Sequence, residues 1–91
     1  MYATKIKMCS GYSNSLNCQD IDSIYLEGVT KPDFYKKETL HDFLVKNPDT
    51  ITVNLGSHPN LEPAVSPKGT KYVRSESNNT EQDNLLKLPR V

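Results

Sequence analysis

The chain has 91 residues, enough for one small domain and too few for two, and 35% of them are hydrophobic. Eleven Lys and Arg residues balance eleven Asp and Glu residues, so the formal net charge is +0 and summed positive charge offers no global grip on nucleic acid. No apolar run approaches the roughly 20 residues of a membrane helix, and Lys5 and Lys7 interrupt the stretch where a signal peptide would be apolar. We therefore expect a soluble, cytoplasmic protein without a membrane partner.

Residues 2–8 alternate with the two-residue period of a half-buried strand. One face of this predicted strand carries Tyr2, Thr4, Ile6 and Met8. The polar, turn-rich segment 10–15 follows, and alternation resumes over residues 20–28 through Ile24 and Leu26. An antiparallel hairpin with a long loop is therefore predicted.

The segment 36–46 has the period of an amphipathic helix. Leu40, Phe43 and Leu44 fall at positions i, i+3 and i+4 and so share one face. Asn47 tolerates the left-handed conformation that ends many helices, and the following proline cannot continue the helix. We therefore predict one helix that ends at Asn47.

A regular strand and an irregular segment are predicted after the helix. Residues 49–55 alternate cleanly, with Ile51, Val53 and Leu55 on one face. The segment 56–70 is rich in Pro and Gly, so it is predicted as a long loop or as a broken edge strand around Ala64.

The end of the chain carries the most specific pattern. A short strand is predicted over residues 71–75, which read Lys-Tyr-Val-Arg-Ser. A polar stretch with Thr80 follows, and residues 83–89 then read Asp-Asn-Leu-Leu-Lys-Leu-Pro. Residues 76–91 are therefore treated as a signature loop and closing segment.

This ending resembles the closing signature of domain-of-unknown-function family 3892, a small family of bacteria, archaea and phages. Its members typically end with a Lys-Tyr-Leu-Arg-Thr-like strand, a polar loop that contains Thr, and an Asn-Leu-x-x-Leu-Pro terminus. Val73 and Ser75 depart mildly from this pattern and keep its β-branched and hydroxyl character. The order of the predicted strands and helix also looks similar. The resemblance implies a fold and a surface, and it carries no assigned activity.

Arg74 has two interpretations. In the first, its guanidinium is a structural clamp that pairs with Asp83 or with loop carbonyls, while the leucines of the closing segment, Leu85, Leu86 and Leu88, plug the core. In the second, it faces a groove and binds an anionic group together with neighbouring polar side chains. We favour the clamp. The predicted binding set is Arg74, Ser75, Thr80, Asp83, Asn84 and Tyr72.

Other reactive side chains form no recognisable catalytic or metal motif. Cys9 and Cys18 lack the paired spacing of zinc ligands and are predicted to be free thiols, although their positions around one loop could let them pair under oxidising conditions. His41 is placed on the polar or boundary face of the helix and His58 in the Pro-rich loop, each without a neighbouring nucleophile. The four glycines are scattered, so no phosphate loop is present. We expect no catalytic residue, no metal and no cofactor.

The predicted architecture is a single α+β domain over residues 1–91 in the order β-β-α-β-β. It has one antiparallel sheet, a helix packed on one face, and the closing segment folded over the sheet. One sheet face is left exposed, and five tyrosines, of which Tyr12, Tyr25 and Tyr35 are placed on the surface, favour a polar interface.

Two functional hypotheses follow. The first is a non-catalytic binding or interaction module that is carried by a phage or mobile element and acts on a host protein, with self-association as a variant. The second is a binder of a small anionic or nucleotide-like ligand through Arg74 and the polar loop after it. Nucleic acid is not expected as a partner, because Lys31, Lys36 and Lys37 are interleaved with acidic residues.

Overall fold

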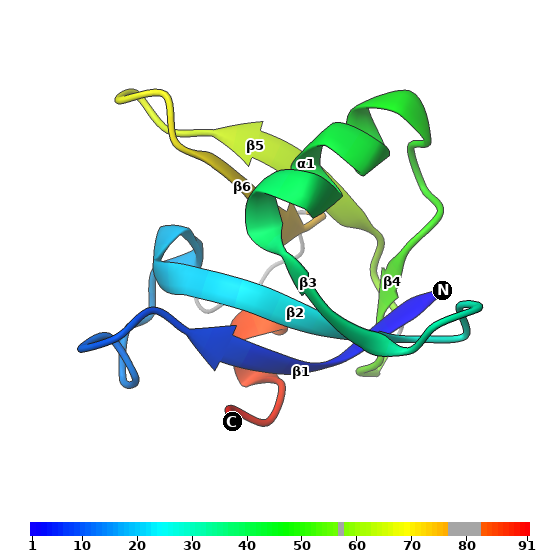
Figure 1. The fold of residues 1–91 in the computed structure, drawn as a ribbon, viewed down its shortest axis with the longest axis horizontal. Helices are drawn as coiled ribbons and strands as arrows, with labels where there is room; N and C mark the ends of the chain where they lie inside the picture. Colours follow the sequence, from blue (N-terminus) through cyan, green and yellow to red (C-terminus); the bar gives the residue numbers. More distant parts are fainter. Residues whose placement is uncertain (57, 77–82) are drawn as a thin grey trace.

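A computed structural model of the chain describes residues 1–56, 58–76 and 83–91. Its elements (Figure 1) are β1 (Tyr2–Met8), η1 (Cys18–Asp20), β2 (Ile21–Glu27), β3 (Asp33–Lys36), α1 (Lys37–Lys46), β4 (Thr52–Val53), β5 (Leu61–Val65), β6 (Lys71–Ser75) and η2 (Asn84–Lys87). The described strands form a four-stranded sheet in the order β3-β2-β1-β4 and a two-stranded ribbon of β5 and β6. The α+β class predicted from the sequence is confirmed.

The strands β1 and β2 form the predicted antiparallel hairpin. Ile6 lies opposite Ile24, and both are completely buried. The register shifts between Ala3 and Lys5, so Thr4 is an extra residue that forms a β-bulge. The predicted alternation is therefore wrong before Ile6. Ala3 is buried on the core side, while Thr4 is only partly buried.

The prediction of one antiparallel sheet is wrong in two respects. The strand β4 pairs with β1 in parallel, because the chain crosses over through α1 before it returns to the sheet. The ribbon of β5 and β6 pairs separately. The regular part of β4 covers two residues rather than the predicted 49–55, although Ile51 and Val53 are buried as expected.

The ribbon contains part of the Pro-rich segment 56–70. Leu61 to Val65 pair with β6, which agrees with the alternative of an edge strand. Pro63 lies opposite Val73, at the free edge of β5, where the missing N–H of a proline breaks no ladder hydrogen bond. The strand predicted over residues 71–75 is present as β6, in which Val73 and Ser75 are buried and Arg74 is exposed.

A strand that was not predicted, β3, precedes the helix and pairs with β2. The helix itself begins at Lys37, one residue later than predicted, and Asn47 is its C-cap. Asn47 has φ −134° and is therefore not left-handed, because a residue before proline is restricted to extended conformations. The positive φ of 60° falls on Asp49 instead.

The helix α1 lies over the core side of the sheet and beside the ribbon (Figure 1). Leu40 and Leu44 are buried as predicted, but Phe43 is only partly buried. His41 is 8% exposed, which corrects its expected boundary position, and its Nδ1 lies 3.0 Å from Asp42 Oδ1. In the described part of the chain no helix is long and apolar enough to cross a bilayer.

The closing segment completes the core, as predicted. Leu85, Leu86 and Leu88 are all buried. Beyond them, the backbone N–H of Ile6 donates to the carbonyl of Pro89 at 2.9 Å, and the N–H of Val91 donates to the carbonyl of Ile6 at 3.0 Å. Residues 89–91 therefore lie along the edge of β1, the first strand of the chain. The buried apolar residues are Ala3, Ile6, Met8, Cys18, Ile21, Ile24, Leu26, Leu40, Leu44, Ile51, Val53, Leu61, Val73, Leu85, Leu86 and Leu88.

Candidate functional site

The predicted binding residues do not converge on one surface. Tyr72 and Arg74 are on the face of β6 opposite to Ser75, because neighbouring strand residues point to opposite sides. Ser75 lies with Asp83 and Asn84 on the buried side. Thr80 is outside the described residues.

A clamp is present, but Asp83 makes it rather than Arg74. One carboxylate oxygen of Asp83 accepts three hydrogen bonds: from the Ser75 N–H at 3.1 Å, the Ser75 hydroxyl at 2.9 Å and the Leu85 N–H at 2.9 Å. The Asn84 N–H in turn donates to the Ser75 hydroxyl oxygen at 3.2 Å. Asp83 is also the N-cap of η2. These bonds attach the closing segment to β6.

The predicted pairing of Arg74 with Asp83 is wrong, and the alternative pairing with loop carbonyls concerns residues 77–82, which lie outside the described residues. The Nε of Arg74 contacts Glu62 Oε1 at 3.1 Å across the ribbon, because the antiparallel register places these two residues opposite each other. The two side chains are 53% and 40% exposed. An ion pair this exposed contributes about 0–1 kcal/mol. Arg74 is therefore a surface residue, without Ser75 or Asp83 beside it as ligand partners.

The two cysteines are free in the structure and differ in environment. Cys18 is buried, and its burial, followed by the nearby charge of Asp83, raises the pKa of its thiol to about 12. It is therefore protonated and a poor nucleophile. Cys9 is half-buried, 4.0 Å from the Nζ of Lys37, which donates to the Gln19 carbonyl at 2.9 Å. Among the described residues, no group of three or more His, Cys, Asp or Glu side chains could hold a metal ion.

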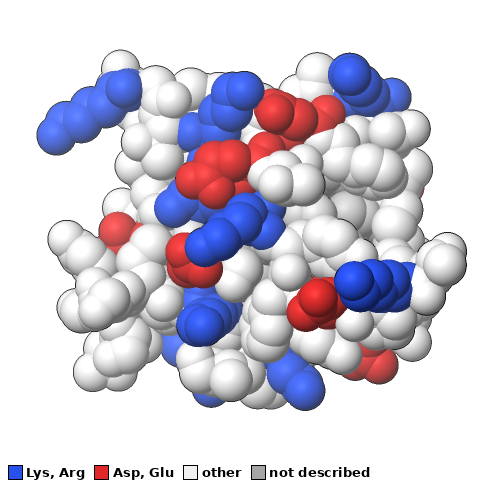
Figure 2. Space-filling view, in the orientation of Figure 1, with Lys and Arg blue, Asp and Glu red and all other residues white. Residues whose placement is uncertain are grey.

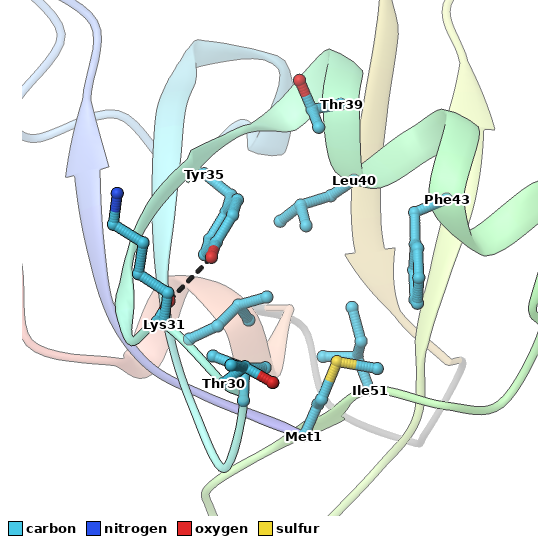
Figure 3. Close-up of a pocket in the computed structure, with 10 residues that line it drawn as sticks. Met1, Thr30, Lys31, Tyr35, Thr39, Leu40, Phe43 and Ile51 are labelled. Carbon is cyan, nitrogen blue, oxygen red and sulfur yellow. Dashed lines mark hydrogen bonds between the residues drawn. The ribbon is translucent and has the colours of Figure 1, made fainter.

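A pocket of about 330 Å³ lies between α1, the connection from β2 to β3, and the segment before β4 (Figure 3). Leu40 and Phe43 enter it from the helix, and Ile51 and Met1 lie on the opposite side. The full lining is Met1, Leu26, Val29, Thr30, Lys31, Tyr35, Thr39, Leu40, Phe43 and Ile51.

One hydrogen bond and one glycine shape the wall formed by the connection. The Tyr35 hydroxyl donates to the Lys31 carbonyl at 2.7 Å (Figure 3), which ties the connection to β3. Gly28 turns the chain out of β2 with φ +72°, and a Cβ there would lie 3.0 Å from the Tyr2 ring. The Lys31 ammonium points away from the cavity in Figure 3. The interior is therefore apolar, and its one nearby phenol is already bonded.

The pocket could not be found by sequence reasoning, because its lining comes from four separated parts of the chain. Phe43, which the sequence places on the apolar face of the helix, is only partly buried in the structure and lines the pocket. Figure 2 shows basic and acidic side chains interleaved on the visible face, in agreement with the zero net charge. The electrostatics of that face thus single out no anionic or cationic ligand.

The comparisons with known proteins gave one match. A family model described as "Protein of unknown function (DUF3892)" matches residues 15–89 of the chain. No curated protein and no solved structure matches it. The matched range contains the clamp of Ser75 and Asp83 and all of the pocket lining except Met1.

Proposed function

The chain belongs to the DUF3892 family, and we propose that it is a non-catalytic interaction module that takes an apolar side chain of a partner protein into the pocket between α1 and the connection from β2 to β3. The observation that carries the proposal is the pocket itself. Its volume of about 330 Å³ is at the lower end of ligand sites, which suits one or two large side chains.

The chemistry of the interior favours an apolar occupant. Leu26, Leu40 and Ile51 offer hydrocarbon surface, and the hydroxyl of Tyr35 is engaged by the Lys31 carbonyl. A charged or strongly polar ligand would lose its hydration there without gaining hydrogen bonds, which costs several kcal/mol. An aromatic or aliphatic side chain would instead gain about 25 cal/mol for each Å² of apolar surface removed from water.

The margin of the pocket is suited to a protein rather than to a small hydrocarbon. Thr30, Lys31 and Thr39 line the pocket and are exposed, so their polar groups can reach a partner around the opening. An apolar anchor surrounded by a polar rim is the usual organisation of a protein interface. The partner would thus be recognised by one deep side chain and by polar contacts around it.

The proposal includes no catalytic step and leaves the anionic alternative with less support. The buried thiol of Cys18 is protonated, and the pocket lining holds no His, Asp or Glu that could act as a base for its hydroxyl groups. An anion at Arg74 would compete with Glu62, and Ser75 and Asp83 would face away from it.

A peptide-display selection tests the proposal. Peptides are selected on the parent protein, and their affinities are measured by calorimetry against Val29→Glu, which places a carboxylate in the lining, and against Val45→Glu, the same change on the exposed side of α1. We expect the selected peptides to share a large apolar residue, to bind Val45→Glu as tightly as the parent, and to bind Val29→Glu at least tenfold more weakly.

Two further measurements guard this test. Val29→Trp fills the cavity without adding charge and should weaken binding similarly, so a folding defect of Val29→Glu would not decide the result. Amide NMR shifts on peptide addition should be largest around Leu40 and Phe43. Equal affinity for the parent and both Val29 variants, or shifts confined to another surface, would refute the proposal.

A further inference from the structure

The face of the four-stranded sheet opposite the pocket carries a second distinctive surface. The strand registers place two rows of side chains across β1, β2 and β3 on this outer face: Lys5–Tyr25–Phe34 and Lys7–Ser23–Lys36. The row between them, Ile6–Ile24–Tyr35, points to the core side, where Tyr35 lines the pocket. The outer face and the pocket are therefore on opposite sides of the sheet.

The outer face combines aromatic rings with ammonium groups. The rings of Tyr25 and Phe34 meet edge to face, with centroids 5.1 Å apart and planes at 74°. The Nζ of Lys5 lies 4.9 Å from the centroid of the Tyr25 ring, in cation–π contact. Both rings are only partly buried. Two paired strands thus hold aromatic side chains at the surface, and the neighbour of the Tyr25 ring is the Lys5 ammonium.

The charge on the outer face is locally positive although the whole chain is neutral. Lys5, Lys7 and Lys36 are all exposed. Lys36 pairs with Asp22 at 3.0 Å, and its hydrogen bond lowers the pKa of that carboxyl. Glu27, opposite Tyr2, places a negative charge at the far end of the hairpin. Among the described residues Lys5 and Lys7 form no ion pair, although the charge of Lys7 also lowers the pKa of Asp22, so both ammonium groups can meet an anion.

We infer that the outer face binds single-stranded nucleic acid, with a base stacked on Phe34 or Tyr25 and phosphates at Lys5 and Lys7. Exposed rings on a sheet stack on unpaired bases, and lysines beside them neutralise the backbone. A base on Tyr25 would take the place of the Lys5 ammonium, which then reaches a neighbouring phosphate. The inference departs from the sequence-based expectation, because the strand registers assemble a patch that the net charge does not show.

Fluorescence anisotropy of a labelled 12-nucleotide single strand of mixed sequence, as RNA and as DNA, tests the inference at 25 and 100 mM NaCl. The double variant Lys5→Gln, Lys7→Gln is compared with Lys46→Gln, Lys68→Gln, which removes the same charge from exposed positions elsewhere. We expect the outer-face variant to bind at least tenfold more weakly and to reduce the slope of log affinity against log salt by about 1.4, since each phosphate contact contributes about 0.7. The control should stay within threefold of the parent.

A stacking variant separates base contacts from simple charge attraction. Phe34→Leu keeps an apolar side chain at a position that is partly exposed and should weaken binding about 5- to 100-fold with the salt slope unchanged. Thermal melts verify that each variant is folded. NMR shifts of Tyr25 and Phe34 in the parent protein on addition of the single strand test the same surface without any variant. Absence of binding at 25 mM NaCl, equal losses in the two lysine variants, unchanged affinity of Phe34→Leu, or equally tight binding of the corresponding duplex would each overturn the inference. The pocket proposal would be unaffected by any of them.

Discussion

Replacement of Asp83 by alanine should destabilise the whole domain, because one carboxylate oxygen connects the closing segment to β6. That oxygen accepts hydrogen bonds from two groups of Ser75 and from the Leu85 N–H. Alanine leaves these three donors without their acceptor. It also removes the N-cap of η2, the helical turn whose residues Leu85 and Leu86 are buried in the core.

The magnitude follows from the number and environment of these bonds. A hydrogen bond to a charged acceptor contributes about 1.5–3 kcal/mol, and loss of an N-cap costs about 0.5–2 kcal/mol. The contributions do not add in full, because Asp83 is half-buried and water can reach some of the donors. We expect Asp83→Ala to lower the free energy of unfolding by about 2–4 kcal/mol, which lowers the Tm of a domain of this size by about 8–30 °C.

Urea denaturation followed by circular dichroism measures this change. Asp83→Asn keeps an acceptor oxygen but not the charge, so it should lose about half as much, since charge-assisted bonds are roughly twice as strong as neutral ones. Ser75→Ala combined with Asp83→Ala in a double-mutant cycle should show a coupling of about 1 kcal/mol or more. A loss below about 1 kcal/mol for Asp83→Ala would refute the view that this carboxylate anchors the closing segment.

Four other experiments distinguish features of the structure. Arg74→Gln should alter the free energy of unfolding by less than about 1 kcal/mol in urea melts, because its ion pair is exposed; a loss of 2 kcal/mol would contradict the observed partner. Leu44→Ala should cost about 2–5 kcal/mol and Phe43→Ala clearly less, because the Phe43 ring lines an open pocket; the reverse order would mean that α1 is rotated. Iodoacetamide at pH 8 should label Cys9 and leave Cys18 unmodified in the native protein. Between pH 9 and 12 the native state keeps the Cys18 proton that the unfolded chain releases, so stability should fall by about 1 kcal/mol per pH unit more than in Cys18→Ala; identical pH profiles would exclude this.

The features that were predicted correctly are those that neighbouring residues decide. Ile24 and Leu26 recur at the strand period and are buried in β2, and Leu40 and Leu44 recur at the helix period and are buried in α1. The chain has few apolar residues, so the leucines of the closing segment were predicted to be buried. Local periodicity was sufficient in each of these cases.

The features that were missed depend on residues far apart in the chain. The strand β3 is four residues long, too short for a periodic signal, and is held by its pairing with β2. Arg74 contacts Glu62 because of the ribbon register, which the Pro-rich segment gave no means to predict. His41 is buried because α1 packs between the sheet and the ribbon, so its buried stripe is wider than the leucine pattern. The pocket also depends on non-local contacts, because its lining joins α1 to the connection from β2 to β3 and to Ile51.

The pairing of Ile6 with Pro89 and Val91 has a consequence for how the chain folds as it is synthesised. Of the described strands, β1 is synthesised first, yet its edge is completed by residues that come after all of these strands in the sequence. The entropy of closing such a long loop grows only slowly with its length, so the cost in stability is modest. The cost in time is larger, because the strand edge stays unpaired until residues 89–91 have been made and can meanwhile pair with another nascent chain. A ribosome that pauses before Pro89 would therefore prolong the time for which this strand edge stays exposed.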